Sequence, residues 1–136
     1  MGTKMDVRPH TGFDGKYLGL TTFKRDGTGV TTPVWFVREA GRLLVETDPE
    51  SFKVKRIRRE PTVSVTLCTA RGRLLEIPVP AHAEILPDDE VPRVEALMAR
   101  KYRWDMLIFK PLRAIQRVLH IGRYRGKTII LAITPT

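Results

Sequence analysis

The sequence contains almost no cysteine. Cys68 is the only cysteine among 136 residues, so the chain cannot form an internal disulfide or a zinc site built on several cysteines. It lies in an apolar stretch with the pattern of a strand, where a lone cysteine is typical of a small buried side chain rather than of a nucleophile. A reducing cytoplasm is therefore the expected setting.

Long apolar runs are absent as well. The first residues lack the apolar core of about 7–15 residues that a signal peptide requires. No run of about 18 apolar residues occurs anywhere in the chain. We therefore expect an intracellular protein without a membrane span.

Motifs for metal or nucleophilic chemistry are also missing. The three histidines, His10, His82 and His120, are too far apart in the sequence to form a local metal motif, so we expect no metal. The chain has no G-x-S-x-G, no Walker loop and no G-x-G-x-x-G. If the protein is an enzyme, a bound cofactor carries the chemistry.

Positive charge is abundant. The chain has 24 Lys and Arg against 15 Asp and Glu, and the formal net charge of +9 indicates an anionic partner. Aromatic residues amount to only 7% and no nucleic-acid-binding signature is present. Nucleic acid is therefore a weaker candidate than a phosphorylated cofactor.

Six segments have the features of short strands. Residues 16–23 and 30–37 flank Asp26-Gly27, which predicts a hairpin. A turn at Ala40-Gly41 leads into residues 42–47, so the first 47 residues are predicted to form a three-stranded meander. The other predicted strands cover residues 62–69, 73–86 and 127–134.

Proline modifies two of these strands. Pro33 cannot donate a ladder hydrogen bond, which predicts an edge strand, a bulge or another neighbour there. Pro78 and Pro80 interrupt the strand over residues 73–86.

A short basic helix is predicted over residues 49–60. Asp48 suits the N-cap, Pro49 suits the first helical position, and Pro61 ends the run. Two further helices are predicted over residues 87–102 and 105–119, from apolar residues at helical spacing.

The basic helix has two different faces. Val54 and Ile57 are spaced to face the core, whereas Lys55, Arg56 and Arg59 fall together on another side. A solvated charged face is the plain alternative to a binding surface.

The length fits one domain. The predicted fold class is mainly β with α, namely a six-stranded antiparallel barrel flanked by helices. A barrel is expected because closing the sheet removes its exposed edges. We expect residues 16–136 to form this domain and residues 1–15 to be a flexible N-terminal segment.

The start of the basic helix is a candidate phosphate site. Amide groups at a helix start attract anions. Ser51 and Lys53 stand in the first turn, and Thr47 at the end of the preceding strand can add a hydroxyl. These residues favour phosphate binding over a merely solvated helix.

The order of these parts resembles a known family. The stretches that carry the resemblance are YLGLTTFKRDGTGVTTPVWFV, LLVETDPESFKVKRIRREPTVSVTLC, KYRW and GKTIILAI. They are similar to the flavin and deazaflavin oxidoreductases with a split β-barrel, which include pyridoxamine 5′-phosphate oxidase, and most of all to the branch that uses the deazaflavin coenzyme F420, common in actinobacteria. The resemblance spans roughly residues 16–134.

The resemblance implies a set of site residues. Those beside the tricyclic ring would be Thr32, Pro33, Val34 and Trp35, and those at the cofactor phosphate would be Thr47, Ser51 and Lys53, with Lys55 and Arg56 nearby. It also implies a homodimer with the cofactor at the interface and hydride transfer to a small, largely apolar substrate. Tyr102, Trp104 and Phe109 are candidates for the substrate wall, with ordinary core packing as the alternative.

Two alternatives remain open at this stage. An FMN-dependent oxidoreductase of the pyridoxamine 5′-phosphate oxidase type has the same fold, although the chain ends in AITPT where that type carries R-L-x-P. A non-catalytic module that binds a cofactor or nucleic acid is the other. The longer anionic tail of coenzyme F420 favours the deazaflavin for so basic a chain.

Overall fold

The structure is a computed structural model that describes residues 12–104 and 127–136. Its strands are β1 (Tyr17–Phe23), β2 (Gly29–Val34), β3 (Val37–Glu39), β4 (Arg42–Thr47), β5 (Thr62–Cys68), β6 (Val79–Ile85) and β7 (Ile129–Pro135). Its helices are α1 (Phe52–Arg59) and α2 (Val91–Lys101), the latter preceded by a 3₁₀ turn over Asp88–Glu90. The helix predicted over residues 105–119 lies outside the described residues.

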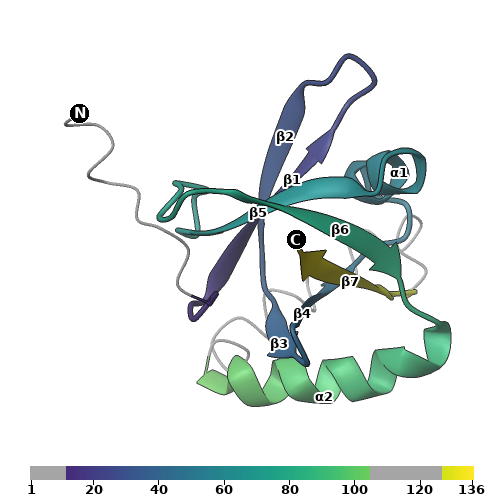
Figure 1. The fold of residues 1–136 in the computed structure, drawn as a ribbon. Coiled ribbons are helices and arrows are strands. Elements are labelled where there is room, and N and C mark those ends of the chain that lie inside the picture. The colour runs from purple at the N-terminus through teal and green to yellow at the C-terminus, as the bar shows by residue number, and fades with distance from the viewer. Residues whose placement is uncertain (1–11, 105–126) are drawn as a thin grey trace.

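The strands form one curled antiparallel sheet in the order β2-β1-β5-β6-β7-β4-β3 (Figure 1). Its two edge strands, β2 and β3, are successive parts of residues 29–39. This segment pairs with β1 through β2 and with β4 through β3, at the two opposite ends of the sheet. It therefore closes the sheet into a barrel, which is split where β2 ends. This confirms the predicted fold class, and it explains why six predicted strands become seven.

The predicted three-stranded meander is wrong. Among the described strands, β2 pairs only with β1, whereas β4 pairs with β3 and β7. The reason lies at Trp35 and Phe36, where the chain leaves one edge of the sheet and joins the other. Turn signals reveal which neighbouring strands form hairpins, but they do not reveal this change of edge.

Both predicted turns are present. At the tip of the β1–β2 hairpin, Gly27 has φ +88° and donates its N–H to the Lys24 carbonyl, while the Asp26 carboxylate accepts from the Thr28 N–H at 2.9 Å. Between β3 and β4, Ala40 and Gly41 both have positive φ, at 51° and 79°. Paired left-handed residues suit the twist of a two-residue hairpin.

Helix α1 begins later than predicted. The Asp48 carboxylate accepts from the Glu50 N–H at 2.8 Å, and its carbonyl accepts from the Ser51 N–H at 3.1 Å, so residues 48–51 form a turn instead of a helix. Ser51 is the N-cap, because its hydroxyl accepts from the Val54 N–H at 3.4 Å. Asp48 as the N-cap was thus wrong by three positions.

The strand predicted over residues 73–86 is also shorter. A turn with Gly72 at φ +89° follows β5, and regular pairing resumes only at β6, after Pro78. Before it, Leu75 donates to the Leu67 carbonyl at 2.9 Å and Leu74 forms an isolated bridge with Cys68. The prolines thus delay the ladder without preventing it, since Pro80 pairs with Ser64.

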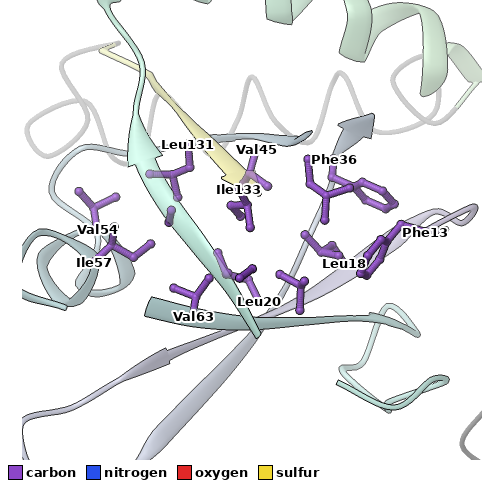
Figure 2. Packing of buried hydrophobic residues seen from close by; sticks show 14 of the residues in the cluster. Phe13, Leu18, Leu20, Phe36, Val45, Val54, Ile57, Val63, Leu131 and Ile133 are labelled. Atoms are coloured by element: carbon purple, nitrogen blue, oxygen red, sulfur yellow. The ribbon is translucent and has the colours of Figure 1, made fainter. Parts of the chain in front are cut away.

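The main core lies inside the barrel (Figure 2). Alternate residues of the strands point inward, and α1 adds Val54 and Ile57, as predicted. Phe13 belongs to the same cluster, so packing extends to that residue. The labelled side chains in Figure 2 are Phe13, Leu18, Leu20, Phe36, Val45, Val54, Ile57, Val63, Leu131 and Ile133.

A second cluster lies between α2 and the sheet. Val94, Met98 and Tyr102 pack against Ile130 and other residues of β3, β4 and β7. β7 is therefore buried on both faces, with Ile129 to Ile133 all at most 4% exposed, which accounts for its continuous apolar run. α2 runs along the outside of the barrel (Figure 1).

Candidate cofactor-binding site

The cations of α1 are in three different situations. Lys55 and Arg58 are exposed on the helix surface, and Lys53 is half-buried. Arg56 and Arg59 contact β1: Arg56 Nε donates to the Thr22 hydroxyl at 2.6 Å, and an Arg59 guanidinium N–H donates to the Phe23 carbonyl. The predicted stripe of cations is therefore partly an attachment of the helix to the β1–β2 hairpin.

Lys53 is a half-buried cation of α1 whose charged form is disfavoured by its surroundings. Burial lowers the pKa of its ammonium group, and the neighbouring Arg56 lowers it further, while Asp48 acts in the opposite direction. None of the ion pairs formed among the described residues involves Lys53. A half-buried ammonium of this kind would be stabilised by a bound anion.

The other candidate phosphate residues flank Lys53 along the chain. Thr47 ends β4 and is only 7% exposed, and Ser51 caps the helix that Lys53 enters. The β4–α1 connection thus carries, close together in the sequence, two hydroxyls, the first amides of a helix and one ammonium. This donor set suits a phosphate group.

The candidate ring residues lie on an edge strand. Thr32, Pro33 and Val34 of β2 are half-exposed and pair with Leu20, Gly19 and Leu18 of β1, respectively. The edge position confirms the expectation for Pro33, whose missing N–H costs nothing on the unpaired side. Trp35 follows directly after β2 and is half-exposed.

β1 connects the helix that carries candidate phosphate residues with the strand that carries candidate ring residues. Thr22 and Phe23, which Arg56 and Arg59 contact, pair with Val30 and Gly29 at the start of β2. α1 therefore contacts the same strand, β1, with which β2 pairs. The sequence did not show these contacts, because the partners lie on different elements.

Trp35 stacks on Tyr102, which follows α2. The two ring centroids are 4.3 Å apart and the planes differ by 5°. Tyr102 is buried, with 1% exposed, and its hydroxyl lies within hydrogen-bonding distance of the backbone at Lys16 and Phe36. Tyr102 was a candidate for the substrate wall, and in this chain it is a buried residue that contacts Trp35 and Phe36.

Lys101 is a functional candidate that sequence reasoning missed. Its Nζ donates to the Phe36 carbonyl at 2.7 Å and lies 3.6 Å from the centre of the Phe36 ring. Burial, and then the charge of Arg38, lower its pKa to about 8. A lysine at the end of a helix is usually a favourable helix cap, so the sequence carried no signal for this position.

The remaining candidates are scattered. Trp104 is 70% exposed after α2, and Phe109 lies outside the described residues. A cavity of about 600 Å³ lies beside the β3–β4 hairpin, lined by Arg38, Glu39 and Arg42 among others, and none of the predicted cofactor residues lines it. The cofactor candidates therefore lie apart from this cavity.

The described residues show neither a membrane-spanning helix nor a metal cluster. No helix there combines the length and apolar character that crossing a bilayer demands. The described ranges also hold no cluster of three histidine, cysteine or acidic side chains suited to a metal ion.

Solved structures share the fold at low sequence identity. The haem storage protein HutZ of Vibrio cholerae has a TM-score of 0.61 and 16% identity, over 92% of this chain and 84% of that one. General stress protein 26 of Bacillus anthracis gives 0.58 and 21%, over 99% and 90%. A protein described as an F420 reductase gives 0.51 and 16%, over 98% and 92%. These likenesses concern the fold alone.

The sequence itself identifies the family. No curated protein matches the chain. Residues 14–136, however, match the family described as pyridoxamine 5′-phosphate oxidase. The match covers nearly the whole chain and agrees with the split barrel that the structure shows. The chain therefore belongs to the pyridoxamine 5′-phosphate oxidase family.

Proposed function

We propose that the protein is an F420-dependent reductase, in which the start of α1 binds the cofactor phosphate and β2 lies beside the deazaflavin ring. The observation that carries the proposal is Lys53. Its half-buried ammonium lies in the first turn of a serine-capped helix, and burial and Arg56 disfavour its charged form until an anion binds.

Charge favours the deazaflavin over FMN. FMN brings one phosphate, whereas coenzyme F420 adds a lactyl carboxylate and a poly-glutamate tail. Lys55 on α1 and Arg25 at the tip of the β1–β2 hairpin are exposed and can attract this tail. Arg56 and Arg59 contribute positive potential while their guanidinium groups contact β1.

The residues of this chain would bind and orient rather than react. The bound, reduced cofactor supplies a hydride to a small, largely apolar substrate. Thr32, Pro33, Val34 and Trp35 would hold the ring, and Thr47, Ser51 and Lys53 would hold the phosphate. Orientation and exclusion of water are what such a transfer requires of the protein.

A second copy of the chain completes the proposed site. The candidate ring residues Thr32, Pro33, Val34 and Trp35 are half-exposed in one chain, and a two-fold partner would cover the ring and supply the rest of the substrate wall. The proposal includes a cytoplasmic location, since the single cysteine is compatible with a reducing compartment.

Cofactor titration tests the proposal. The purified protein is titrated with coenzyme F420 and with FMN, followed by fluorescence, and the titrations are repeated for Lys53→Ala. Arg58→Ala is the matched control, because it removes one exposed positive charge from the same helix. We expect F420 to bind more tightly than FMN, Lys53→Ala to weaken binding about tenfold or more, and Arg58→Ala to change it little.

Two other results of the titration would change the functional assignment. Tighter binding of FMN would move the protein to the flavin-dependent part of its family and leave the phosphate site intact. Binding of neither cofactor, with salt-dependent retardation of generic RNA in a gel, would refute the enzyme proposal and favour an anion-binding module.

A further inference from the structure

We propose that Tyr102 is a positioning residue for the ring side of the cofactor site, assisted by Lys101. The two residues at the end of α2 fix Trp35 and the break between β2 and β3. The inference rests on the proposed function, in which the ring lies beside residues 32–35.

Phe36 is where the sheet loses its regular partners. The β1–β2 ladder ends at Val34, and the β3–β4 ladder begins at Val37, so Phe36 belongs to neither. Its backbone is buried and must find other hydrogen-bonding partners. A break of this kind is stable only if side chains replace the missing strand.

The end of α2 provides these side chains. The Phe36 N–H donates to the Tyr102 hydroxyl oxygen at 3.0 Å, and Lys101 Nζ donates to the Phe36 carbonyl at 2.7 Å. The Tyr102 hydroxyl donates in turn to the Lys16 carbonyl at 2.6 Å, just before β1. One phenol thus joins the segment before β1 to the segment after β2.

The Tyr102 ring has a second role. It is buried and parallel to the indole of Trp35, with 4.3 Å between the centroids. Stacking on a ring that packing holds still fixes the plane of the half-exposed indole. Tyr102 therefore orients Trp35, which is the residue proposed to contact the cofactor ring, through this stacking contact.

This support matters because β2 is an edge strand. β1 holds it on one side only, so the end near Trp35 depends on the contacts at Phe36 and Tyr102. A site held in its binding geometry before the ligand arrives loses less entropy on binding. Loosening this support should weaken binding of the ring without removing any ligand contact.

Tyr102→Phe separates these roles, because it removes the hydroxyl and keeps the stacked ring. Tyr17→Phe is the matched control: it also removes one phenolic hydroxyl, from a half-exposed position on β1. Each variant is titrated with FMN and riboflavin, and with F420 and its deazaflavin chromophore without the phosphate. Thermal unfolding shows whether each variant is folded at the temperature of the titration.

We expect Tyr102→Phe to weaken the phosphate-bearing and phosphate-free ligands by the same factor, about five- to tenfold. Lys53→Ala should weaken only the ligands that carry a phosphate, and Tyr17→Phe should change neither. A purely structural role for Tyr102 would lower the melting temperature and leave the affinities of the folded protein unchanged.

Tryptophan emission provides a readout that needs no cofactor. The chain has two tryptophans, so Trp104→Phe leaves Trp35 as the sole emitter. In that background, Tyr102→Phe should shift the Trp35 emission or lower its anisotropy, because the indole gains freedom.

The outcomes distinguish the two proposals. If the wild type binds a cofactor and Tyr102→Phe binds it equally well, the positioning role is refuted and the proposed function stands. If the wild type binds neither cofactor, both proposals fail. If Trp35 emission is unchanged in the variant, the claim that the hydroxyl fixes Trp35 is refuted independently of any ligand.

Discussion

The Nε atom of Arg56 on α1 lies 2.6 Å from the hydroxyl oxygen of Thr22 on β1. Thr22 is fully buried, and it pairs with Val30 at the start of β2. This hydrogen bond therefore connects the helix proposed to hold the phosphate with the hairpin proposed to hold the ring. The contact of Arg59 with the Phe23 carbonyl makes a second connection of the same kind.

A double-mutant cycle should detect this link as a coupling free energy. We expect Arg56→Met and Thr22→Val each to lower the free energy of unfolding, and the pair to show a coupling of about 1 kcal/mol, because the bond has a charged donor and a buried acceptor. Urea unfolding measures all four proteins. Arg58→Met combined with Thr22→Val is the control and should be additive, and additivity of the Arg56 pair would refute the link.

The helix illustrates what the sequence could predict and what it could not. Helical spacing correctly placed Val54 and Ile57 in the core, because the 3.6-residue period is a local property of the chain. The same period could not separate Lys53, which is half-buried, from Arg56, which contacts β1. That difference depends on Thr22, 34 residues away in the sequence.

The barrel shows the same limit at a larger scale. The turns at Asp26-Gly27 and Ala40-Gly41 were predictable, since positive φ selects particular residues within a few positions. The pairing of β4 with β7 was not, because both strands are apolar and many registers bury such strands equally well. The family resemblance supplied the fold class, which the local patterns only suggested.

The Ala40-Gly41 turn offers a stabilising substitution. Ala40 has φ +51°, a left-handed conformation that disfavours a side chain with a β-carbon but that asparagine tolerates. We expect Ala40→Asn to raise the free energy of unfolding by about 0.5 kcal/mol, as measured in urea. Gly41→Ala, at φ +79°, should lower it by about 1 kcal/mol, and a stabilising effect of that second change would contradict the assigned turn.

Lys101 should be an unusually reactive lysine. Its pKa is lowered to about 8, chiefly by burial and then by Arg38, so a large share of its amine is unprotonated at pH 8. We expect an amine-acylating reagent at limiting concentration to label Lys101 before Lys24 and Lys55, which are exposed as Lys101 is, as quantified by mass spectrometry of peptides. Equal labelling of the three would show that the contacts with Phe36 keep the ammonium protonated.

Arg93 links α2 to the edge of the sheet through Glu39. Arg93 donates to the carboxylates of Glu39 on β3 and Glu90 before the helix, and Arg42 lies 3.7 Å from Glu39. The hydrogen bond from Arg93 lowers the pKa of Glu39 below its usual 4.5. A carboxyl group with a depressed pKa in the folded state stabilises the fold above its unfolded pKa, and this contribution is lost as the pH falls through the folded pKa.

The stability of Arg93→Met relative to wild type should therefore depend on pH. At pH 7 the variant should be the less stable protein, because the carboxylate of Glu39 has lost its strongest partner; below the folded pKa of Glu39 the two proteins should converge. Urea unfolding at a series of falling pH values, with the protonation of Glu39 in the folded protein followed by NMR, measures how the difference changes. Arg100→Met, an exposed change on the same helix, should show a small difference from wild type throughout the series. A deficit of Arg93→Met that persists undiminished once Glu39 is protonated would mean that Arg93 stabilises the protein through the packing of its methylene groups rather than through the carboxylate of Glu39.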